Sequence, residues 1–233
     1  MRSFWDRRAA ENALYFVDNQ LDYRHPDAQD FWGHGEYELD ELLDSVGAKV
    51  LPTDEVVDIG CGVGRLTRVL AQRGASARAI DVSPEMLRLA REYGRELDNV
   101  EWLLGDGVSL GGIADSSADV CISHVVFQHI PDPQITLGYV REIGRVLRPG
   151  GWAAFQVSNY PELHHRRTGR EALGIRLRAL LGLGPKGQTD PAWLGSFIDL
   201  EDLRRAADDG AMDVERVTGE GKQLCYVLTR RRP

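Results

Sequence analysis

Residues 56–67 read Val56-Val57-Asp58-Ile59-Gly60-Cys61-Gly62-Val63-Gly64-Arg65-Leu66-Thr67, a short apolar strand that runs through three alternating glycines into a helix. Glycine adopts positive φ at little steric cost, so these positions allow a sharp turn and let backbone N–H groups approach a bound molecule. The start of the following helix favours a negatively charged group. The pattern predicts a ligand-binding crevice for a nucleotide-like molecule.

The spacing of these glycines distinguishes between classes of nucleotide ligand. The dinucleotide fingerprint G-x-G-x-x-G has a third glycine that lets the helix pack closely, and counting from Gly60 its place is taken by Arg65. This difference weakens the NAD interpretation. A P-loop is not indicated, since neither Gly-Lys-Ser nor Gly-Lys-Thr follows the loop. A ligand with a small anionic end and a nucleoside remains, and a plain tight turn is the alternative for the glycines taken alone.

Two acidic residues follow the next two predicted strands. Asp81 ends an apolar segment about 20 residues beyond the glycine turn, where a carboxylate accepts hydrogen bonds from ribose hydroxyls. Asp106, in Gly105-Asp106-Gly107, follows residues 100–104 and is placed to meet the exocyclic amine of a base. Each aspartate alone is more often a turn former or a helix cap. Together with Asp58, acids at three successive strand ends favour a binding site.

The rest of the chain alternates predicted strands with amphipathic helices, which is typical of a doubly wound α/β protein. Helix starts are marked by Ser83-Pro84 and Asp132-Pro133, because serine and aspartate cap helices and proline suits the first turn. Ligands of such sheets bind beyond the carboxyl ends of the strands, where the glycines and acids lie. The predicted strands are residues 55–59, 77–81, 100–104, 119–123, 152–157, 212–218 and 223–229.

With these motifs the chain resembles the class I S-adenosylmethionine (SAM)-dependent methyltransferases, and in particular their small bacterial, type 11-like members. The resemblance is close over residues 50–157 and looser over the C-terminal strands. It implies a Rossmann-like, doubly wound seven-stranded sheet, mostly parallel, in which the last two strands form an antiparallel hairpin at the edge. The residues that carry it are Asp58 to Gly64, Asp81, Gly105-Asp106, Asp119 to His124 leading to Phe127 to Asp132, and Leu147 to Gly151.

The resemblance also implies where the cofactor SAM binds. The glycine turn holds its methionine part, Asp81 the ribose and Asp106 the adenine, while the backbone around Ser123 and His124 surrounds the sulfonium. The cofactor-binding residues predicted on this basis are Asp58, Gly60, Cys61, Gly62, Gly64, Asp81, Val82, Met86, Gly105, Asp106, Gly107, Ser123 and His124.

Length and composition fit one α/β domain, since 233 residues with 42% apolar side chains can bury one large core. The net charge of −8 argues against nucleic acid as a partner. Three widely spaced cysteines fit free thiols, so no metal site is expected. No signal peptide or membrane-spanning run is recognised, and we expect a cytoplasmic protein without a membrane partner.

We expect a single methyltransferase domain over residues 1–233. Its predicted parts are an N-terminal helical cap at 1–50, a cofactor-binding core at 51–157, a substrate-side insertion at 158–198, and a C-terminal helix and hairpin at 199–233.

The predicted cap is rich in aromatic side chains, among them Phe31 and Trp32. Two roles are open. The rings form the apolar faces of helices that cover the core, or Phe31 and Trp32 belong to a lid that excludes water from the methyl donor. In the second case we expect Trp32 to lie at the acceptor.

The predicted insertion carries a basic cluster that includes His164, Arg166 and Arg167. A solvated basic helix face is one interpretation. The other is an anionic acceptor, such as a carboxylate-bearing or phosphate-bearing small molecule, held by Arg166 and Arg167.

Methyl transfer from a sulfonium is an in-line displacement, for which a protein mainly holds the acceptor near the methyl group. A base is needed only where the acceptor must lose a proton. His124 and His129, which follow the fourth predicted strand, are the candidate catalytic residues. The alternative for His129 is a structural role beside the turn at Asp132-Pro133.

We therefore predict a SAM-dependent methyltransferase that acts on a small-molecule acceptor by O- or N-methylation, for example in specialised metabolism. The alternatives are methylation of a protein or RNA component and a non-catalytic SAM-binding module. An NAD-dependent oxidoreductase is the least supported class. The sequence does not indicate the acceptor, the methylated atom or the oligomeric state.

Overall fold

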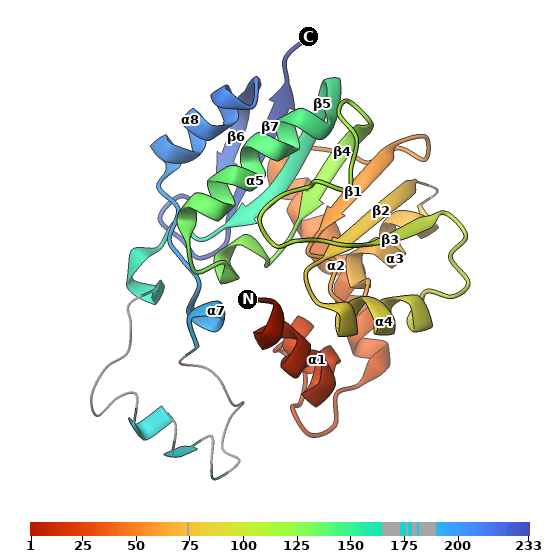
Figure 1. Ribbon diagram of the computed structural model, residues 1–233, viewed down its shortest axis with the longest axis vertical. Helices are drawn as coiled ribbons and strands as arrows, with labels where there is room; N and C mark the ends of the chain where they lie inside the picture. The colour runs from red at the N-terminus through yellow and green to blue at the C-terminus, as the bar shows by residue number, and fades with distance from the viewer. Residues whose placement is uncertain (74, 165–172, 176, 179–180, 182–189) are drawn as a thin grey trace.

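The computed structural model describes residues 1–73, 75–164, 173–175, 177–178, 181 and 190–233. The strands are β1 (Glu55–Ile59), β2 (Ser76–Asp81), β3 (Val100–Leu104), β4 (Ala118–Ser123), β5 (Leu147–Val157), β6 (Met212–Thr218) and β7 (Cys225–Arg231). They form one seven-stranded sheet in the order β3-β2-β1-β4-β5-β7-β6 (Figure 1). β1 to β5 pair in parallel, whereas β7 is antiparallel to β5 and β6. The predicted doubly wound sheet with an antiparallel edge hairpin is confirmed.

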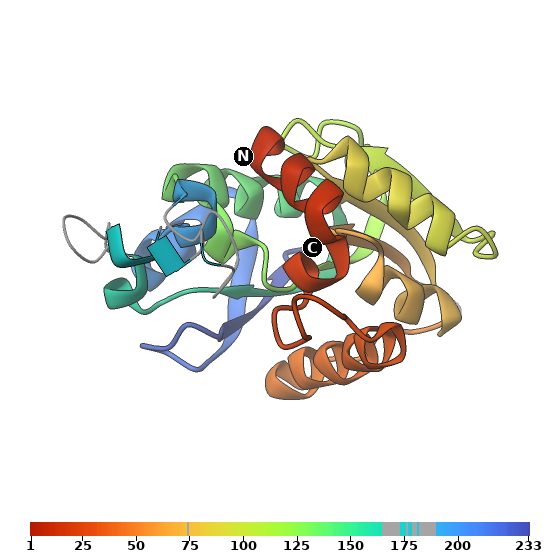
Figure 2. The same ribbon diagram turned by 90° about the horizontal axis from the view of Figure 1, so that it is seen from below.

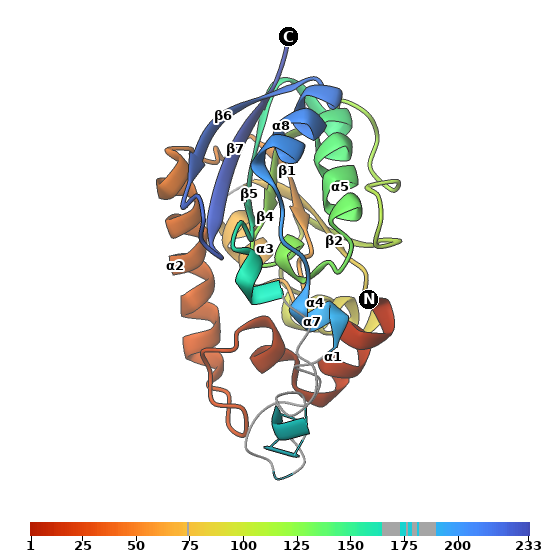
Figure 3. The ribbon, with the colours of Figure 1, turned by 90° about the vertical axis from the view of Figure 1, so that its left-hand side faces the viewer.

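Helices cover both faces of this sheet. The α-helices are α1 (Arg2–Val17), α2 (Ala28–Val46), α3 (Arg65–Gln72), α4 (Pro84–Tyr93), α5 (Pro133–Val146), α7 (Pro191–Leu194) and α8 (Leu200–Asp209), and the short 3₁₀ helices are η1 (Phe127–His129) and η2 (Pro161–His164). α5 and α8 pack on one face, while α2 and α3 pack on the other (Figure 3).

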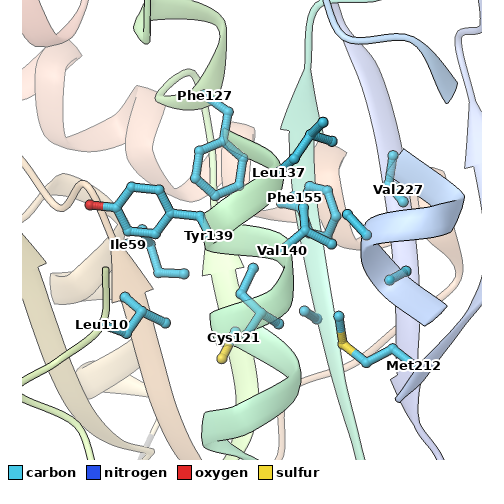
Figure 4. Packing of buried hydrophobic residues seen from close by; sticks show 14 of the residues in the cluster. Ile59, Leu110, Cys121, Phe127, Leu137, Tyr139, Val140, Phe155, Met212 and Val227 are labelled. Carbon is cyan, nitrogen blue, oxygen red and sulfur yellow. The ribbon is translucent and has the colours of Figure 1, made fainter. Parts of the chain in front are cut away.

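Alternation along the strands builds a separate apolar core on each face. In β1, Val57 points to the core under α5 and Val56 points to the core under α2 and α3. Figure 4 shows the ring of Phe127 beside Tyr139 of α5 and Phe155 of β5, and its centroid lies 5.7 Å from each of theirs. This packing fixes the segment that follows β4.

Two helix starts form as the local sequence predicts. The Ser83 Oγ accepts a hydrogen bond from the backbone N–H of Met86 at 3.1 Å, and proline occupies the first turn. Asp132 accepts one from the N–H of Gln134 at 2.9 Å in the same way. Both caps satisfy N–H groups that have no partner within the helix.

Four strands differ from the predicted ones, β2 and β4 by one residue at their start and β5 and β7 by more. β5 begins at Leu147 rather than at residue 152, because Leu147 already pairs with Ala118 of β4. β7 spans 225–231 rather than 223–229, since it follows a turn in which Gly219 and Gly221 have φ of +82° and +73°.

The carboxyl ends of β1 and β2 face α1, which crosses this end of the sheet (Figure 2). The last residue of α1, Val17, reaches the glycine turn: a Cβ built on Gly62 would lie 3.1 Å from its Cγ2 atom. In the described part of the chain, no helix combines the length and hydrophobicity needed to cross a bilayer.

The contact between α5 and the end of α8 leads to a first prediction. A Cβ atom on Gly144 of α5 would lie 2.1 Å from the carbonyl oxygen of Gly210, and neither backbone can yield easily. We expect Gly144→Ala to lower the free energy of unfolding by about 2–3 kcal/mol, measured by urea denaturation.

Gly138→Ala in the same helix is the matched control, because its Cβ would make only an ordinary contact, 3.9 Å from the carbonyl oxygen of Val108. There the higher helix propensity of alanine should stabilise the protein by about 0.5–1 kcal/mol. Equal effects of the two substitutions would contradict the packing argument.

Candidate functional site

A cavity of about 660 Å³ opens at the carboxyl ends of β1, β2 and β4. It extends from the glycine turn past η1 to α7 and β7. The predicted site residues that line it are Asp58, Gly60, Cys61, Gly62, Asp81, Val82, Met86, Gly105, Gly107, His124 and His129. The structure therefore brings most of the predicted site together in one crevice.

The three alternating glycines all have positive φ, at +76°, +55° and +87° for Gly60, Gly62 and Gly64. Side chains from other segments approach two of them closely: a Cβ on Gly60 would lie 2.5 Å from Val126, and one on Gly64 would lie 2.6 Å from the ring of Trp102. Glycine is required here both by the turn and by this close packing.

The backbone donors of this turn are not free, contrary to the expectation that they point at a ligand. The N–H groups of Gly60 and Cys61 donate to the carbonyl oxygen of Ile80 at 2.8 and 3.1 Å. That of Gly62 donates to the Asp81 carboxylate at 2.9 Å. The turn is thus locked onto β2, and its glycines contribute close approach rather than unused donors.

The three acids differ in their surroundings. Burial raises the pKa of Asp58 to about 6, although the hydroxyl of Thr67 donates to it at 2.5 Å and lowers the pKa. Burial also raises the pKa of Asp81, whose second oxygen accepts from the N–H of Ser83 at 2.8 Å. Asp106 is exposed and does not line the cavity; its carboxylate accepts from the N–H groups of its own loop, including that of Ser109 at 2.8 Å. Asp106 therefore shapes the loop whose glycines do line the cavity.

The segment after β4 joins the crevice through a strained turn. The Ser123 hydroxyl is buried and donates to the carbonyl oxygen of Ile59 at 3.0 Å, which ties β4 to β1. Val125 then has φ of +55°, a conformation that costs a β-branched residue free energy. This turn orients His124 and Val126 on either side of it. Neither Ser123 nor Gly64 lines the cavity, so both act through packing.

His129 has both ring nitrogens engaged. Its Nδ1 lies 3.1 Å from the carbonyl oxygen of Trp193, so Nδ1 carries the proton and donates. Its Nε2 accepts from the side-chain amide of Gln128 at 3.3 Å, whose oxygen accepts in turn from Gln156 at 3.1 Å. Burial lowers the pKa of His129 to about 4, while the bond to Trp193 acts in the opposite direction. The ring is therefore neutral at pH 7, and its hydrogen bonds connect Trp193 to Gln128.

His124 is placed differently. Its side chain is 3% exposed, and its Nε2 lies 3.4 Å from the Glu38 carboxylate. Its Nδ1 has no hydrogen-bond partner among the described residues. Arg65 holds Glu38 at 2.5 Å and Asp18 at 3.0 Å, so one guanidinium ties both acids to the start of α3. Of the two candidate histidines, His124 is the one with a ring nitrogen that the described residues leave unpaired.

α1 is fastened over the cofactor end of the crevice. Arg2 donates to the carbonyl oxygens of Val82 at 3.1 Å and Gly105 at 2.9 Å, and both of these residues line the cavity. Asp6 accepts from the Ser83 hydroxyl at 2.6 Å. The first turns of α1 are thus bonded to the loops that follow β2 and β3.

Aromatic rings from α1 and α7 meet over the cavity. Trp5 packs edge-on against His129 at 5.4 Å, and Phe16 packs edge-on against Trp193 at 5.9 Å. These rings occupy the position that was predicted for a lid.

Of the predicted acceptor residues, the structure describes Trp32, which lies outside the cavity. Trp32 packs against Phe31 at 4.9 Å and Tyr93 at 5.8 Å, under the guanidinium of Arg68, and it does not line the cavity. Its helical aromatic contacts match the covering-helix alternative. Arg166 and Arg167 lie outside the described residues.

Sequence reasoning missed the acidic side chains that the N-terminal segment contributes to the cavity, Asp18, Glu38 and Glu41. A signal for Glu38 was present, because it lies on the same helical face of α2 as Gly35, Leu39 and Leu42, all of them buried. An acid within an apolar stripe is rarely buried unless it is paired. Its partner, Arg65, was noted only as a departure from the NAD fingerprint.

Together, the fold and this crevice define an α/β protein that binds a nucleoside-containing ligand at the carboxyl ends of its strands. The comparisons with known proteins identify the family. Residues 57–155 match the family model described as "Methyltransferase domain".

The chain is 34% identical over 171 residues to the ubiquinone biosynthesis O-methyltransferase of Methylococcus capsulatus, covering 72% of this chain and 66% of that protein. It is 30% identical over 168 residues to the protein of the same name from Thiobacillus denitrificans, covering 71% and 67%. A demethylmenaquinone methyltransferase of Tropheryma whipplei is 35% identical over 98 residues, or 42% and 39% of the two chains. This chain thus covers about two thirds or less of these relatives.

Solved structures share the fold. The phosphoethanolamine N-methyltransferase 1 of Haemonchus contortus, in complex with phosphoethanolamine and S-adenosylhomocysteine, superposes with a TM-score of 0.69 at 20% identity, covering 99% of this chain and 48% of that one. The Synechocystis magnesium protoporphyrin IX methyltransferase with bound S-adenosylhomocysteine gives 0.64 at 19% identity, covering 99% and 97%.

The chain belongs to the class I SAM-dependent methyltransferases, and SAM is its cofactor. The crevice fits this cofactor, because Gly60 and Gly62 leave no side chain in its floor and the partly buried Asp81 lies at the end of β2.

The bonds of Arg2 lead to a prediction for cofactor binding. We expect Arg2→Ala to weaken binding of S-adenosylhomocysteine about five- to tenfold, because α1 loses its two charged hydrogen bonds to the loops around the cofactor. Isothermal titration calorimetry measures this. Arg7→Ala is the control, since Arg7 is an exposed residue of the same helix that does not line the cavity. Equal affinities for the two variants would contradict the role of Arg2.

The lowered pKa of His129 predicts a pH-dependent stability. The unfolded chain takes up a proton near pH 6.5, but the folded chain does so only near pH 4, so the free energy of unfolding falls as pH decreases through this window. We expect thermal unfolding to show a smaller loss of stability between about pH 7 and pH 5 for His129→Asn than for the wild type. His25→Asn, at an exposed histidine, should follow the wild type. If the stability of His129→Asn falls with pH as steeply as that of the wild type, the titration of His129 is not the cause of the pH dependence.

Proposed function

We propose that this protein transfers the methyl group of SAM to a small-molecule acceptor bound in the same cavity, by O- or N-methylation. The observation that carries the proposal is the continuity of the crevice, which runs from Asp81 and the glycine turn past His124 to Trp193 and Tyr226. The names of the relatives, which refer to ubiquinone biosynthesis and demethylmenaquinone, support a small organic acceptor.

In this proposal the cofactor end is formed by the predicted residues that line the cavity. The Asp81 carboxylate accepts hydrogen bonds from the ribose, and Gly60 and Gly62 let the methionine part lie against bare backbone. Gly105 and Gly107 border the adenine, with Asp106 bracing their loop. When bound, SAM supplies an electrophilic methyl group on its sulfonium.

The remaining catalytic work is positioning. The protein holds the acceptor in line with the methyl group, a proximity effect worth up to about 7–11 kcal/mol in favourable cases. The rings of Trp5, Phe16 and Trp193 exclude water from this region, because they meet over the cavity.

His124 is the proposed general base for an acceptor that loses a proton. Its Nδ1 takes the proton as the acceptor oxygen or nitrogen bonds to the methyl group and the sulfonium becomes a thioether. Glu38 faces the opposite ring nitrogen at 3.4 Å and stabilises the resulting charge. His129 is proposed as a positioning residue, since both of its nitrogens are engaged.

The experiment that tests this function transfers labelled methyl from SAM into an extract of the source cells, which is then separated by size. We expect label in the small-molecule fraction. Label in the macromolecular fraction would favour a protein or RNA acceptor, and no label in either, with S-adenosylhomocysteine still bound, would favour a non-catalytic SAM-binding module.

Two variants in the same assay separate the roles of the histidines. His124→Gln should lower the initial rate roughly 100-fold for an acceptor that loses a proton, whereas His129→Asn, which keeps a donor for Trp193, should stay within about tenfold of the wild type. The reverse order would assign the base to His129.

A further inference from the structure

The charged groups that line the cavity are unbalanced. Among the described residues, the acids on its wall are Asp18, Glu38, Glu41, Asp58 and Asp81, and the permanently charged base is Arg65. His129 and His164 of the wall do not offset this charge at neutral pH, because burial lowers the pKa of both. The described wall therefore carries net negative charge, even after the sulfonium of the cofactor is counted.

Three of these five acids come from outside the strand ends, and Glu41 among them lies near Tyr226 of β7. Asp58 and Asp81 belong to the β1 and β2 ends. The other three acids, Asp18, Glu38 and Glu41, come from the N-terminal segment. Arg65 of α3 pairs with two of them, Asp18 at 3.0 Å and Glu38 at 2.5 Å. The single positive charge of Arg65 offsets one of these three carboxylates. The part of the cavity wall that the N-terminal segment forms therefore stays anionic.

The side chains next to these acids leave polar groups without partners. The His124 side chain is 3% exposed, lines the cavity and has an Nδ1 with no hydrogen-bond partner among the described residues. The ring of Tyr226 stacks parallel to it at 6.1 Å. Burial raises the pKa of the Tyr226 hydroxyl, and the charges of Glu41 and Glu38 add to that rise, so both carboxylates lie near it.

Carboxylates beside aromatic rings form the environment that binds an ammonium group. Tyr37 also lines the cavity from the helix that carries Glu38 and Glu41. A cation there offsets the repulsion between the acids, whereas an anion meets like charge in a partly enclosed space.

We propose that the acceptor carries a positively charged nitrogen, which binds between Glu38 and Glu41 beside the rings of Tyr37 and Tyr226. This inference rests on the proposed function and names the charge class of its acceptor. It reverses the expectation of an anionic acceptor, which depended on arginines outside the described residues. The ammonium is a recognition group, and the methylated atom is the one that reaches the sulfonium beside His124.

Three phenols of the same ring and nearly the same size test the charge preference. Tyramine is cationic, 4-ethylphenol is neutral and 4-hydroxyphenylacetate is anionic at pH 7. Their binding to the full chain saturated with S-adenosylhomocysteine is measured by calorimetry. We expect tyramine to bind at least about fivefold more tightly than 4-ethylphenol, with 4-hydroxyphenylacetate the weakest.

Glu41→Gln locates the preference, because Glu41 is exposed and makes no structural ion pair among the described residues. It should weaken tyramine about fivefold and leave 4-ethylphenol within about twofold. Glu36→Gln is the matched control: the same substitution in the same helix, at a residue that does not line the cavity. Its affinities should equal those of the wild type.

Binding of 4-hydroxyphenylacetate as tight as that of tyramine would overturn the inference, as would binding of none of the three or equal effects of the two substitutions. Each of these results, with S-adenosylhomocysteine bound, leaves the proposed methyl transfer standing. Absence of S-adenosylhomocysteine binding would overturn the proposed function and this inference with it.

Discussion

The site depends on the missing side chain at Gly60. A Cβ atom on Gly60 would lie 2.5 Å from the side chain of Val126. Because Gly60 has no Cβ, Val126 can pack there, and the segment after β4 can approach β1. The Ser123 hydroxyl then bonds to the carbonyl oxygen of Ile59 at 3.0 Å, and the two strand ends become one wall. His124 and the glycine turn share the cavity because this approach is possible. A side chain at position 60 would separate the glycine turn from the segment that carries His124.

A second constraint joins the N-terminal segment to the sheet. Arg65 begins α3 directly after the last glycine of the turn, and it is 4% exposed. A buried guanidinium must be paired, and its partners are Asp18, after α1, and Glu38 of α2. The ion pairs therefore fix both covering helices relative to the cofactor turn. Removing one member of this cluster of Arg65, Asp18 and Glu38 would leave a buried charge without a partner, which is costly. Because burying the charges is itself costly, the cluster fixes the position of the helices more than it adds to the stability of the fold.

Features that depend on local sequence could be predicted, whereas those that depend on tertiary pairing could not. The caps at Ser83 and Asp132 and the strands that end at Ile59 and Asp81 follow from neighbouring residues alone. Leu147 directly follows α5 and is a strand residue because β4 offers it a partner. Trp32 was assigned to the acceptor, yet its neighbours Phe31 and Tyr93 hold it outside the cavity, since an aromatic residue in a helix does not reveal which side it faces. Asp18, Glu38 and Glu41 were missed because their place in the cavity wall exists only in the folded chain.

The short helix α7 has four residues and cannot hold itself together by its own hydrogen bonds. His164 lies with its Nδ1 2.6 Å from the carbonyl oxygen of Leu194, while its Nε2 lies 2.7 Å from the Ser158 hydroxyl. The described residues on the two sides of residues 165–189 are therefore bonded to each other, His164 to Leu194. The entropic cost of closing a loop rises only slowly with its length. The bond between His164 and Leu194 does not depend on the length of the chain between them, so the part of the cavity wall formed by His164, Trp193 and Leu194 can keep its place while that length changes.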